Sequence, residues 1–360
     1  MDNQQFVRFD RDMTSIIKGF AIIFMMLVHC YWHYDDVAID YSDSLLANVN
    51  DVFAVCVSMF TFLVGYGYNF SKNKDLEYSI KHIKKLLIPF WIVLFVFTFP
   101  VCWTEVKEYG IRGLLYNLIG IDSHFNWYSW FVYFFIYAMI VMPFLARFIN
   151  RRPVRHTAII IVASVALSVI IHEIPQFVRL FGISMPRMVE IDSLLALYNT
   201  QVMTPCMVLG YLFANQGYYE RINIGNISKL WTFLICLIVI VLFLVIRHFG
   251  TFTHIPFKMD FFYVPFIIGS IVVLFNKFRW NTFRRIMIKM GEVSVYMWFL
   301  HALFFTPATK SFYQPILSFF RVADLTVAWT IVLTFFASWL IKTVVDACQR
   351  WLSKLVTRTA

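Results

Sequence analysis

A lysine and a histidine share one face of the first apolar segment, and they are the strongest candidates for chemistry in the chain. Lys18 and His29 are eleven positions apart, and every residue between them is apolar or glycine. In a helix this spacing separates the side chains by only about 20° around the axis and roughly 16 Å along it. An ionisable side chain inside a membrane span is costly and marks a functional site by default. Because histidine moves protons near neutral pH, the pattern predicts His29 as a general base.

Two further residues near His29 extend this candidate site. His33 follows His29 by four positions, on nearly the same helix face, and such a pair can bind zinc. We expect no metal, because no well-spaced third ligand is evident beyond Asp35 or Asp36. One of these aspartates could instead orient an imidazole, as carboxylates do in catalytic triads. The competing interpretation of His29 is a structural histidine that hydrogen-bonds to a neighbouring helix.

A second cluster is basic. Lys81, Lys84 and Lys85 precede Pro89 and fall on neighbouring faces of one helical turn. They could hold phosphate groups as point charges, without the bidentate fork of arginine. Alternatively, they only set the orientation of the chain in the membrane.

A third cluster combines aromatic and polar residues at the start of a predicted span. Its Trp and Tyr rings could stack on sugars and its amide and hydroxyl could bond to sugar hydroxyls, although an aromatic belt at the membrane interface has the same composition. These candidates are Asn126, Trp127, Tyr128, Ser129 and Trp130. A fourth group, Glu292, Ser294 and His301, lies on another predicted span, where His301 is either a structural histidine or a site residue.

The composition identifies the class of protein that must position these residues. Of 360 residues, 60% are hydrophobic and 14% are charged, and several apolar stretches approach or exceed the length that crosses a bilayer. The runs are too long and too continuously apolar for the strands of a β-barrel. We therefore expect an all-α polytopic membrane protein, with residues 1–360 forming a single transmembrane domain and no separate soluble domain. The ten expected spans are 15–33, 50–70, 83–102, 126–147, 157–172, 194–214, 230–248, 260–277, 287–306 and 323–346.

Charge alternates between successive loops, which predicts the orientation. The basic residues are concentrated in the N-terminal segment, the even-numbered loops and the C-terminal tail, so both termini are expected in the cytoplasm. The seventh loop, with Arg247 and Lys258, is predicted outside and is the exception. The net charge of +10 is distributed between apolar segments, which argues against nucleic acid as a partner. The first apolar run is expected to be retained as a span, since no small-residue cleavage site follows it.

The order and spacing of these motifs resemble the acyltransferase-3 family of integral-membrane acyltransferases. Members modify cell-surface polysaccharides, lipopolysaccharide or peptidoglycan, usually by O-acetylation. The matching segments are the basic-x10-His motif from Lys18 to His29, the run Phe60-Thr-Phe-Leu-Val64-Gly65-Tyr66, the pair Lys81-x-x-Lys84, the stretch from Trp130 through Pro143, and the stretch from Ser294 through His301. This chain has Val64 where the family has a serine, and lysines where the family commonly has arginines. Without a fused SGNH-type domain, transfer must be completed by the membrane domain or by a partner.

The resemblance implies an acyl-CoA donor, most simply acetyl-CoA, that enters from the cytoplasm, and a glycan or glycolipid acceptor at a bacterial cytoplasmic membrane. Lys81, Lys84 and Lys85, together with Arg11, would bind the donor, and Lys18 would contact the CoA end of the path or hold a partner. His29 would be the general base, with His33, Asp35 and His301 as further catalytic candidates. Ser129, Asn126 and His301 remain alternatives for stabilising the oxyanion.

The main alternative function is that of a transporter or flippase for a polysaccharide precursor or a small anion. It would also place ionisable residues inside helices, but it predicts more intramembrane carboxylates and broken helices in matched halves. A purely structural membrane protein would leave the alignment of Lys18 with His29 unexplained.

Overall fold

The computed structural model is built of helices throughout the residues that it describes, which are 5–32, 44–71, 76–180, 189–250, 259–320 and 322–359. Within those ranges, extended backbone is paired at the isolated bridge between Phe6 and Asn223. This confirms the all-α class. The longer elements are α1 (Arg11–Trp32), α3 (Val55–Asn69), α4 (Leu76–Ile92), α5 (Trp103–Leu118), α6 (Trp130–Arg151), α7 (Pro153–Leu180), α8 (Val189–Gln216), α9 (Lys229–Gly250), α10 (Asp260–Lys277), α11 (Asn281–His301) and α13 (Ala323–Thr359).

Short elements connect these helices. They are α2 (Leu45–Asn48) and the 3-10 turn η2 (Asn50–Ala54) before α3, the π-helical turn η3 (Val93–Thr98) after α4, and η4 (Ala302–Phe304), α12 (Pro307–Tyr313) and η5 (Gln314–Phe319) between α11 and α13.

Seven helical stretches of the described residues are long and apolar enough to cross a membrane, so the chain is an integral membrane protein. They correspond to seven of the ten expected spans and comprise α1, η2 with α3, α6, α7, α9, α10 and α13. The count of ten and the orientation of the chain stay predictions.

The other three expected spans are helical but depart from the simple pattern. The span expected at 83–102 ends as an α-helix at Ile92 and continues as a π-helical turn. Pro89 lacks the N–H that would close the preceding turn, which weakens a regular helix here. Polar residues lower the hydropathy of α8, and α11 carries four charged side chains, Arg284, Arg285, Lys289 and Glu292.

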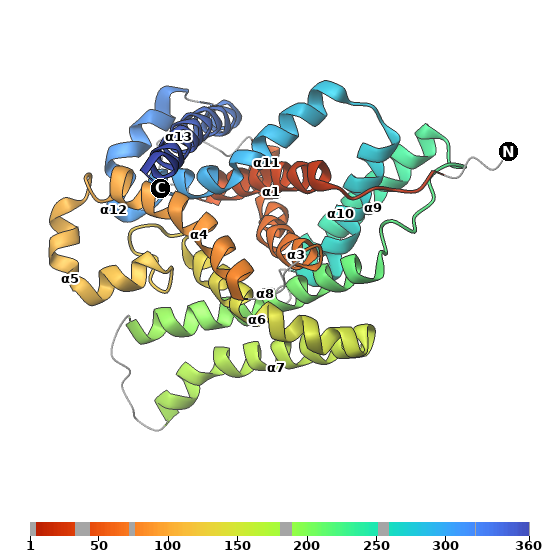
Figure 1. Cartoon of the computed structure of the whole chain (residues 1–360), viewed down its shortest axis with the longest axis horizontal. Coiled ribbons are helices and arrows are strands. Elements are labelled where there is room, and N and C mark those ends of the chain that lie inside the picture. Colours follow the sequence, from red (N-terminus) through yellow and green to blue (C-terminus); the bar gives the residue numbers. More distant parts are fainter. Residues whose placement is uncertain are drawn as a thin grey trace.

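Helix α1 runs through the middle of the molecule and packs against α11 and α3 (Figure 1). Its contact with α11 is close because both helices present a glycine. A Cβ on Gly19 would lie 2.5 Å from the Met287 carbonyl oxygen, and one on Gly291 would lie 1.9 Å from that of Ser15. Small residues that let two backbones touch are the usual device for packing helices in a membrane.

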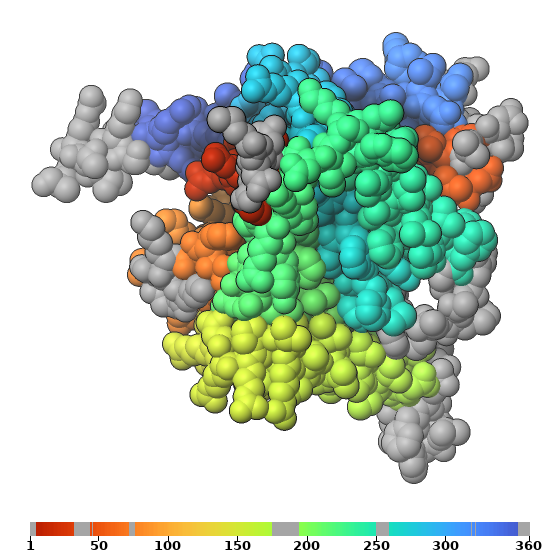
Figure 2. All heavy atoms as spheres, turned by 90° about the vertical axis from the view of Figure 1, so that its right-hand side faces the viewer, coloured from red at the N-terminus to blue at the C-terminus, as the bar shows by residue number. Residues whose placement is uncertain are grey.

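A second close contact joins α3 to α8. A Cβ on Gly65 would lie 1.8 Å from the Met207 carbonyl oxygen, and one on Gly210 would lie 2.0 Å from that of Phe62. Helix α8 also packs against α6 and α7, which gather at one edge of the molecule (yellow in Figure 2). The two glycine contacts, together with the packing of α1 on α3 and of α7 on α8, link α11, α1, α3, α8 and α7 into one continuous assembly.

The α3–α8 contact yields a test with a control on the same helix. Gly65→Ala should lower the free energy of unfolding by about 1–3 kcal/mol, because the new methyl group meets the backbone of α8. Gly67→Ala has open space around its Cβ and should leave stability unchanged or raise it slightly. Thermal unfolding of both variants in detergent measures the difference. Equal midpoints for the two variants would show that the contact is looser than described.

Candidate active site

Two histidines that are far apart in the sequence meet at one end of the α1–α11 pair. Nδ1 of His29 lies 2.7 Å from Nε2 of His301, and both side chains are buried. His29 lies in the last turn of α1, and His301 is the last residue of α11. The glycine contacts between these helices bring the two rings within hydrogen-bonding distance.

The hydrogen bonds of His301 determine which nitrogen carries each proton. Nδ1 of His301 lies 3.1 Å from the Met297 carbonyl oxygen, which can only accept, so this nitrogen is the donor. In a neutral His301, Nε2 is then the acceptor, and Nδ1 of His29 must donate to it. This arrangement places the lone pair of a neutral His29 on Nε2, which is the state a general base requires.

Tyr128 covers both imidazole rings. Its ring centroid lies 3.7 Å from that of His29 with an interplanar angle of 10°, and 4.8 Å from that of His301 with an angle of 7°. The planes of the two histidine rings are nearly parallel, with 4° between them. Three parallel rings in a buried setting fix the orientation of His29.

The loop that carries Tyr128 is attached to α11 by side-chain hydrogen bonds. Nε1 of Trp298 donates to the Tyr128 carbonyl oxygen over 3.0 Å, and Nδ2 of Asn126 donates to the Phe299 carbonyl oxygen over 3.1 Å. Oδ1 of Asn126 accepts from the Tyr128 backbone N–H. Asn126 was predicted to contact a sugar, and in the structure its amide holds the loop in place.

The start of the same loop is supported by α5. Oδ1 of Asn117 accepts from the backbone N–H of Phe125, and Nε2 of His124 lies 2.6 Å from a carboxylate oxygen of Glu105. Gly120 adopts a φ of +74°, and a Cβ there would lie 2.3 Å from the Ser129 carbonyl oxygen. The turn therefore needs a glycine, both for its dihedral angle and for space.

The remaining residues of the aromatic cluster differ in burial. Ser129 is buried, and its hydroxyl has no hydrogen-bond partner within the described part of the chain. Trp127 is exposed and Trp130 is half-buried, so neither side chain is enclosed with the histidine pair. Of the five residues expected to form one sugar-binding surface, Tyr128 lies on the histidine pair and the others surround its backbone.

The basic candidates lie on α1 and α4. Lys18 is half-buried and lies close enough to Lys85 for their charges to interact, and His82 lies within electrostatic range of Lys18, Lys81 and Lys85. Lys81, Lys84, Lys85 and Arg11 are exposed. None of these basic side chains forms an ion pair with a carboxylate of a described residue.

Two predicted catalytic residues, His33 and Asp35, lie outside the described residues, as does Asp36. Across the ranges that are described, no three His, Cys, Asp or Glu side chains converge on a point where a metal ion could bind.

A buried ion pair between α9 and α10 was missed by the sequence analysis, which counted Arg247 as a charge of the seventh loop. Nε of Arg247 donates to Asp260 over 2.9 Å, and both side chains are 3% exposed or less. Opposite charges at the facing ends of consecutive expected spans, 230–248 and 260–277, were the available signal. Since Arg247 is neutralised inside the bundle, it no longer counts against the predicted orientation.

The comparisons with known proteins give one family. The family model described as an acyltransferase domain, Acyl_transf_3, matches residues 15–344. That range contains both histidines, the α4 lysines and the loop that carries Tyr128. No curated protein matches the chain, and no solved structure matches it.

The histidine hydrogen bonds predict tautomers that ¹⁵N nuclear magnetic resonance can measure. With ¹⁵N-labelled histidine near pH 8, we expect His29 and His301 both to carry their proton on Nδ1, because the Met297 carbonyl can only accept. Variants His29→Gln and His301→Gln assign the two sets of signals. A neutral His29 with its proton on Nε2 would contradict the geometry described above.

Proposed function

The chain belongs to the acyltransferase-3 family, and on that basis we propose that it transfers an acyl group, most simply acetyl, from cytoplasmic acyl-CoA to a hydroxyl of a cell-surface glycan or glycolipid. The membrane would be the bacterial cytoplasmic membrane. The observation that carries the proposal is the buried His29–His301 pair beneath Tyr128. It supplies an oriented base inside a membrane domain whose family performs acyl transfer.

In the proposed reaction, Nε2 of His29 takes the proton from the acceptor hydroxyl as its oxygen attacks the thioester carbonyl. A C–O bond forms, the C–S bond of the donor breaks, and His29 returns the proton to the departing CoA thiolate. His301 accepts the Nδ1–H bond of His29 throughout. It therefore stabilises the imidazolium form, which is the role of the carboxylate in a Ser-His-Asp triad.

Tyr128 would also stabilise the imidazolium form of His29. An imidazolium stacked on the face of a phenol ring is stabilised by the ring quadrupole, by about 0.5–2 kcal/mol depending on how far it is desolvated. The ring also occupies one face of both histidines, which restricts access to the edge of His29. Substrates would then reach Nε2 in the plane of the imidazole.

The three candidate donors to the oxyanion, Asn126, His301 and Ser129, differ in the hydrogen bonds that they already make. The amide of Asn126 is engaged with Phe299 and Tyr128, and His301 is engaged with His29 and Met297. The Ser129 hydroxyl is buried and has no partner within the described residues. We therefore assign Ser129 as the donor to the tetrahedral oxyanion, a contribution of about 3–4 kcal/mol where such donors have been removed from other enzymes.

The basic cluster is the proposed donor site. Lys18, Lys81, Lys84, Lys85 and Arg11 form no ion pair with a carboxylate of a described residue, and they would attract the phosphates of CoA. Lys18 and His29 are separated by roughly 16 Å along one helix. This leaves the pantetheine arm to run beside α1 from the basic cluster to the histidine pair.

The transporter alternative predicted intramembrane carboxylates, and Asp260 is a buried one. The acylation assay below separates the two functions, since a transporter has no use for a thioester.

The role of the histidine pair is tested by substitution. With acetyl-CoA and an extract of envelope glycan, His29→Ala should abolish CoA release, and His301→Gln should lower kcat by about 10²–10⁴-fold, because the imidazolium loses its partner. His172→Gln, which changes an exposed histidine on α7, is the control. Thermal unfolding must show that all three variants remain folded. Wild-type transfer by folded His29→Ala would contradict the proposed role of His29.

The donor site is tested by acetyl-CoA binding. Acetyl-CoA should raise the unfolding midpoint of the wild-type protein, and the triple variant Lys81→Ala, Lys84→Ala, Lys85→Ala should lose that stabilisation because the phosphates lose their counter-charge. Lys107→Ala with Lys229→Ala removes charge elsewhere and should keep the response. If neither acetyl-CoA nor a longer acyl-CoA stabilises the wild-type protein, the acyltransferase proposal fails and the transporter alternative takes its place.

A further inference from the structure

The ion pair between Arg247 and Asp260 is buried although one of its two residues belongs to a largely exposed helix. Helix α9 is the most exposed of the apolar helices together with α13, with 11% of its span buried, yet Arg247 is only 2% exposed. The arginine therefore faces the protein interior from a helix that is otherwise mostly exposed. Charged side chains placed this way in membrane proteins are paired with one another and mark substrate or ion sites.

The side chains of Arg247 and Asp260 differ in how completely their polar atoms are hydrogen-bonded. Nε of Arg247 donates to Oδ1 of Asp260, and Nη1 donates to the Asp51 carbonyl oxygen. The second carboxylate oxygen of Asp260 accepts from the Ser58 hydroxyl over 2.8 Å. Nη2 of Arg247 is also buried, but it has no hydrogen-bond partner among the described residues. Both oxygens of the acid are thus engaged, while one arm of the guanidinium is not.

An unpaired arm of a buried guanidinium is unfavourable. A charged donor without an acceptor loses its hydration and gains no hydrogen bond in return. The guanidinium carries only donors, so the missing partner must be an acceptor. Since the planar fork matches the oxygens of a carboxylate or a phosphate, an oxyanion is the ligand that fits it best.

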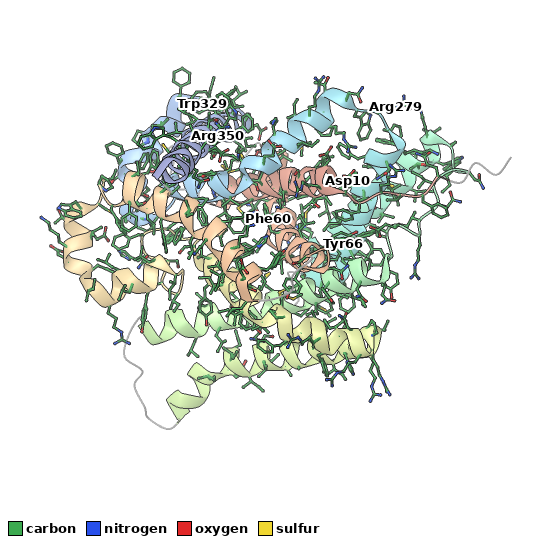
Figure 3. All side chains as sticks on the ribbon, in the orientation of Figure 1. Asp10, Phe60, Tyr66, Arg279, Trp329 and Arg350 are labelled. Carbon is green, nitrogen blue, oxygen red and sulfur yellow. The ribbon has the colours of Figure 1, made fainter. Side chains whose placement is uncertain are left out.

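Helix α3 connects the ion pair with the residues around the histidine pair. Ser58, which bonds to Asp260, precedes Phe60 on α3 by two positions. The Phe60 ring packs edge-on against Trp298 at 5.2 Å, and Trp298 holds the Tyr128 backbone. Figure 3 labels Phe60 and Tyr66, which both lie on α3. The ion pair and the histidine pair are therefore linked through one turn of one helix.

A second connection runs through η2. Asp51, whose carbonyl oxygen accepts from Arg247, belongs to η2, which packs on both α9 and α1. Phe53 of the same turn lies against Phe24 of α1, with ring centroids 5.4 Å apart. Helix α1 also carries His29, so the Arg247 site and the histidine pair share two supporting elements.

We propose that Nη2 of Arg247 binds an oxyanion carried by the acyl acceptor, either the carboxylate of an acidic sugar or the phosphate of a lipid carrier. The inference rests on the proposed function, because it names the chemical class of the acceptor in that reaction. Asp260 and Ser58 hold the guanidinium in position, and the ligand supplies the acceptor that the described residues do not. The site selects acceptors that carry a negative charge at a distance from the reacting hydroxyl.

The conservative variant Arg247→Lys separates this role from packing. A lysine keeps the positive charge and an ion pair with Asp260, but it lacks the second arm of the fork. Arg285→Lys makes the same chemical change at an exposed position on α11 and serves as the control. Thermal unfolding without ligand shows whether each variant retains the stability of the wild-type protein.

The probes are two acids, each with a neutral counterpart. Glucuronate against glucose tests the carboxylate, and farnesyl phosphate against farnesol tests the phosphate. We expect at least one acid to raise the unfolding midpoint of the wild-type protein and of Arg285→Lys, while its neutral counterpart does not. In Arg247→Lys the same acid should bind about tenfold or more weakly, the loss of one charge-assisted hydrogen bond. The acid that binds identifies which source provides the oxyanion.

Two outcomes would overturn the proposal. If neither acid stabilises the wild-type protein more than its neutral counterpart, or if Arg247→Lys responds as the wild type does, the pair only joins α9 to α10. Acetyl-CoA stabilisation is measured on the same samples and should be unchanged in Arg247→Lys. If acetyl-CoA does not stabilise the wild-type protein, that result counts against the proposed function alone, because the anion measurement uses no acyl-CoA.

Discussion

The close contact of α1 with α11 is the constraint on which the candidate site depends. Gly19 and Gly291 let the two backbones touch, and this contact brings together two histidines that are 272 positions apart in the chain. Any larger side chain at either glycine would push the helices apart. The hydrogen bond between the imidazoles, the stacking of Tyr128 and the attachment of its loop to Trp298 all require that the ends of these helices stay in register.

Helix α1 connects the parts of the proposed reaction. Its first turns carry Lys18 beside the lysines of α4, and its last turn carries His29. It also packs on α3, which reaches the ion pair of α9 and α10 through Ser58. A rigid helix at the centre of the bundle therefore sets the separation between the proposed donor phosphates, the base and the acceptor charge. Such fixed spacing favours reactions that need several groups at defined distances.

The sequence predicts the local parts of this arrangement better than the long-range ones. The spacing of Lys18 and His29 needs only helical geometry, and the all-α membrane class follows from composition. The pairing of His29 with His301 depends on how two distant helices cross, and no local pattern encodes that. For the same reason, the bond from Asn126 to Phe299 could not be anticipated from the sequence, and Arg247 was assigned to a loop although Asp260 lies opposite it. Pro89 could have signalled the irregular helix after α4, because its missing N–H is a local property.

The bond from His301 to the Met297 carbonyl has a consequence for proton movement. A carbonyl oxygen cannot accept a proton covalently, so the bond from His301 to Met297 passes no proton on to the backbone of α11. A proton that arrives at Nε2 of His29 is therefore not carried away through this carbonyl. In the proposed reaction, the alcohol and the thiol would therefore exchange one proton at a single point. The proton transfer itself would then move no net charge from one end of the helix bundle to the other.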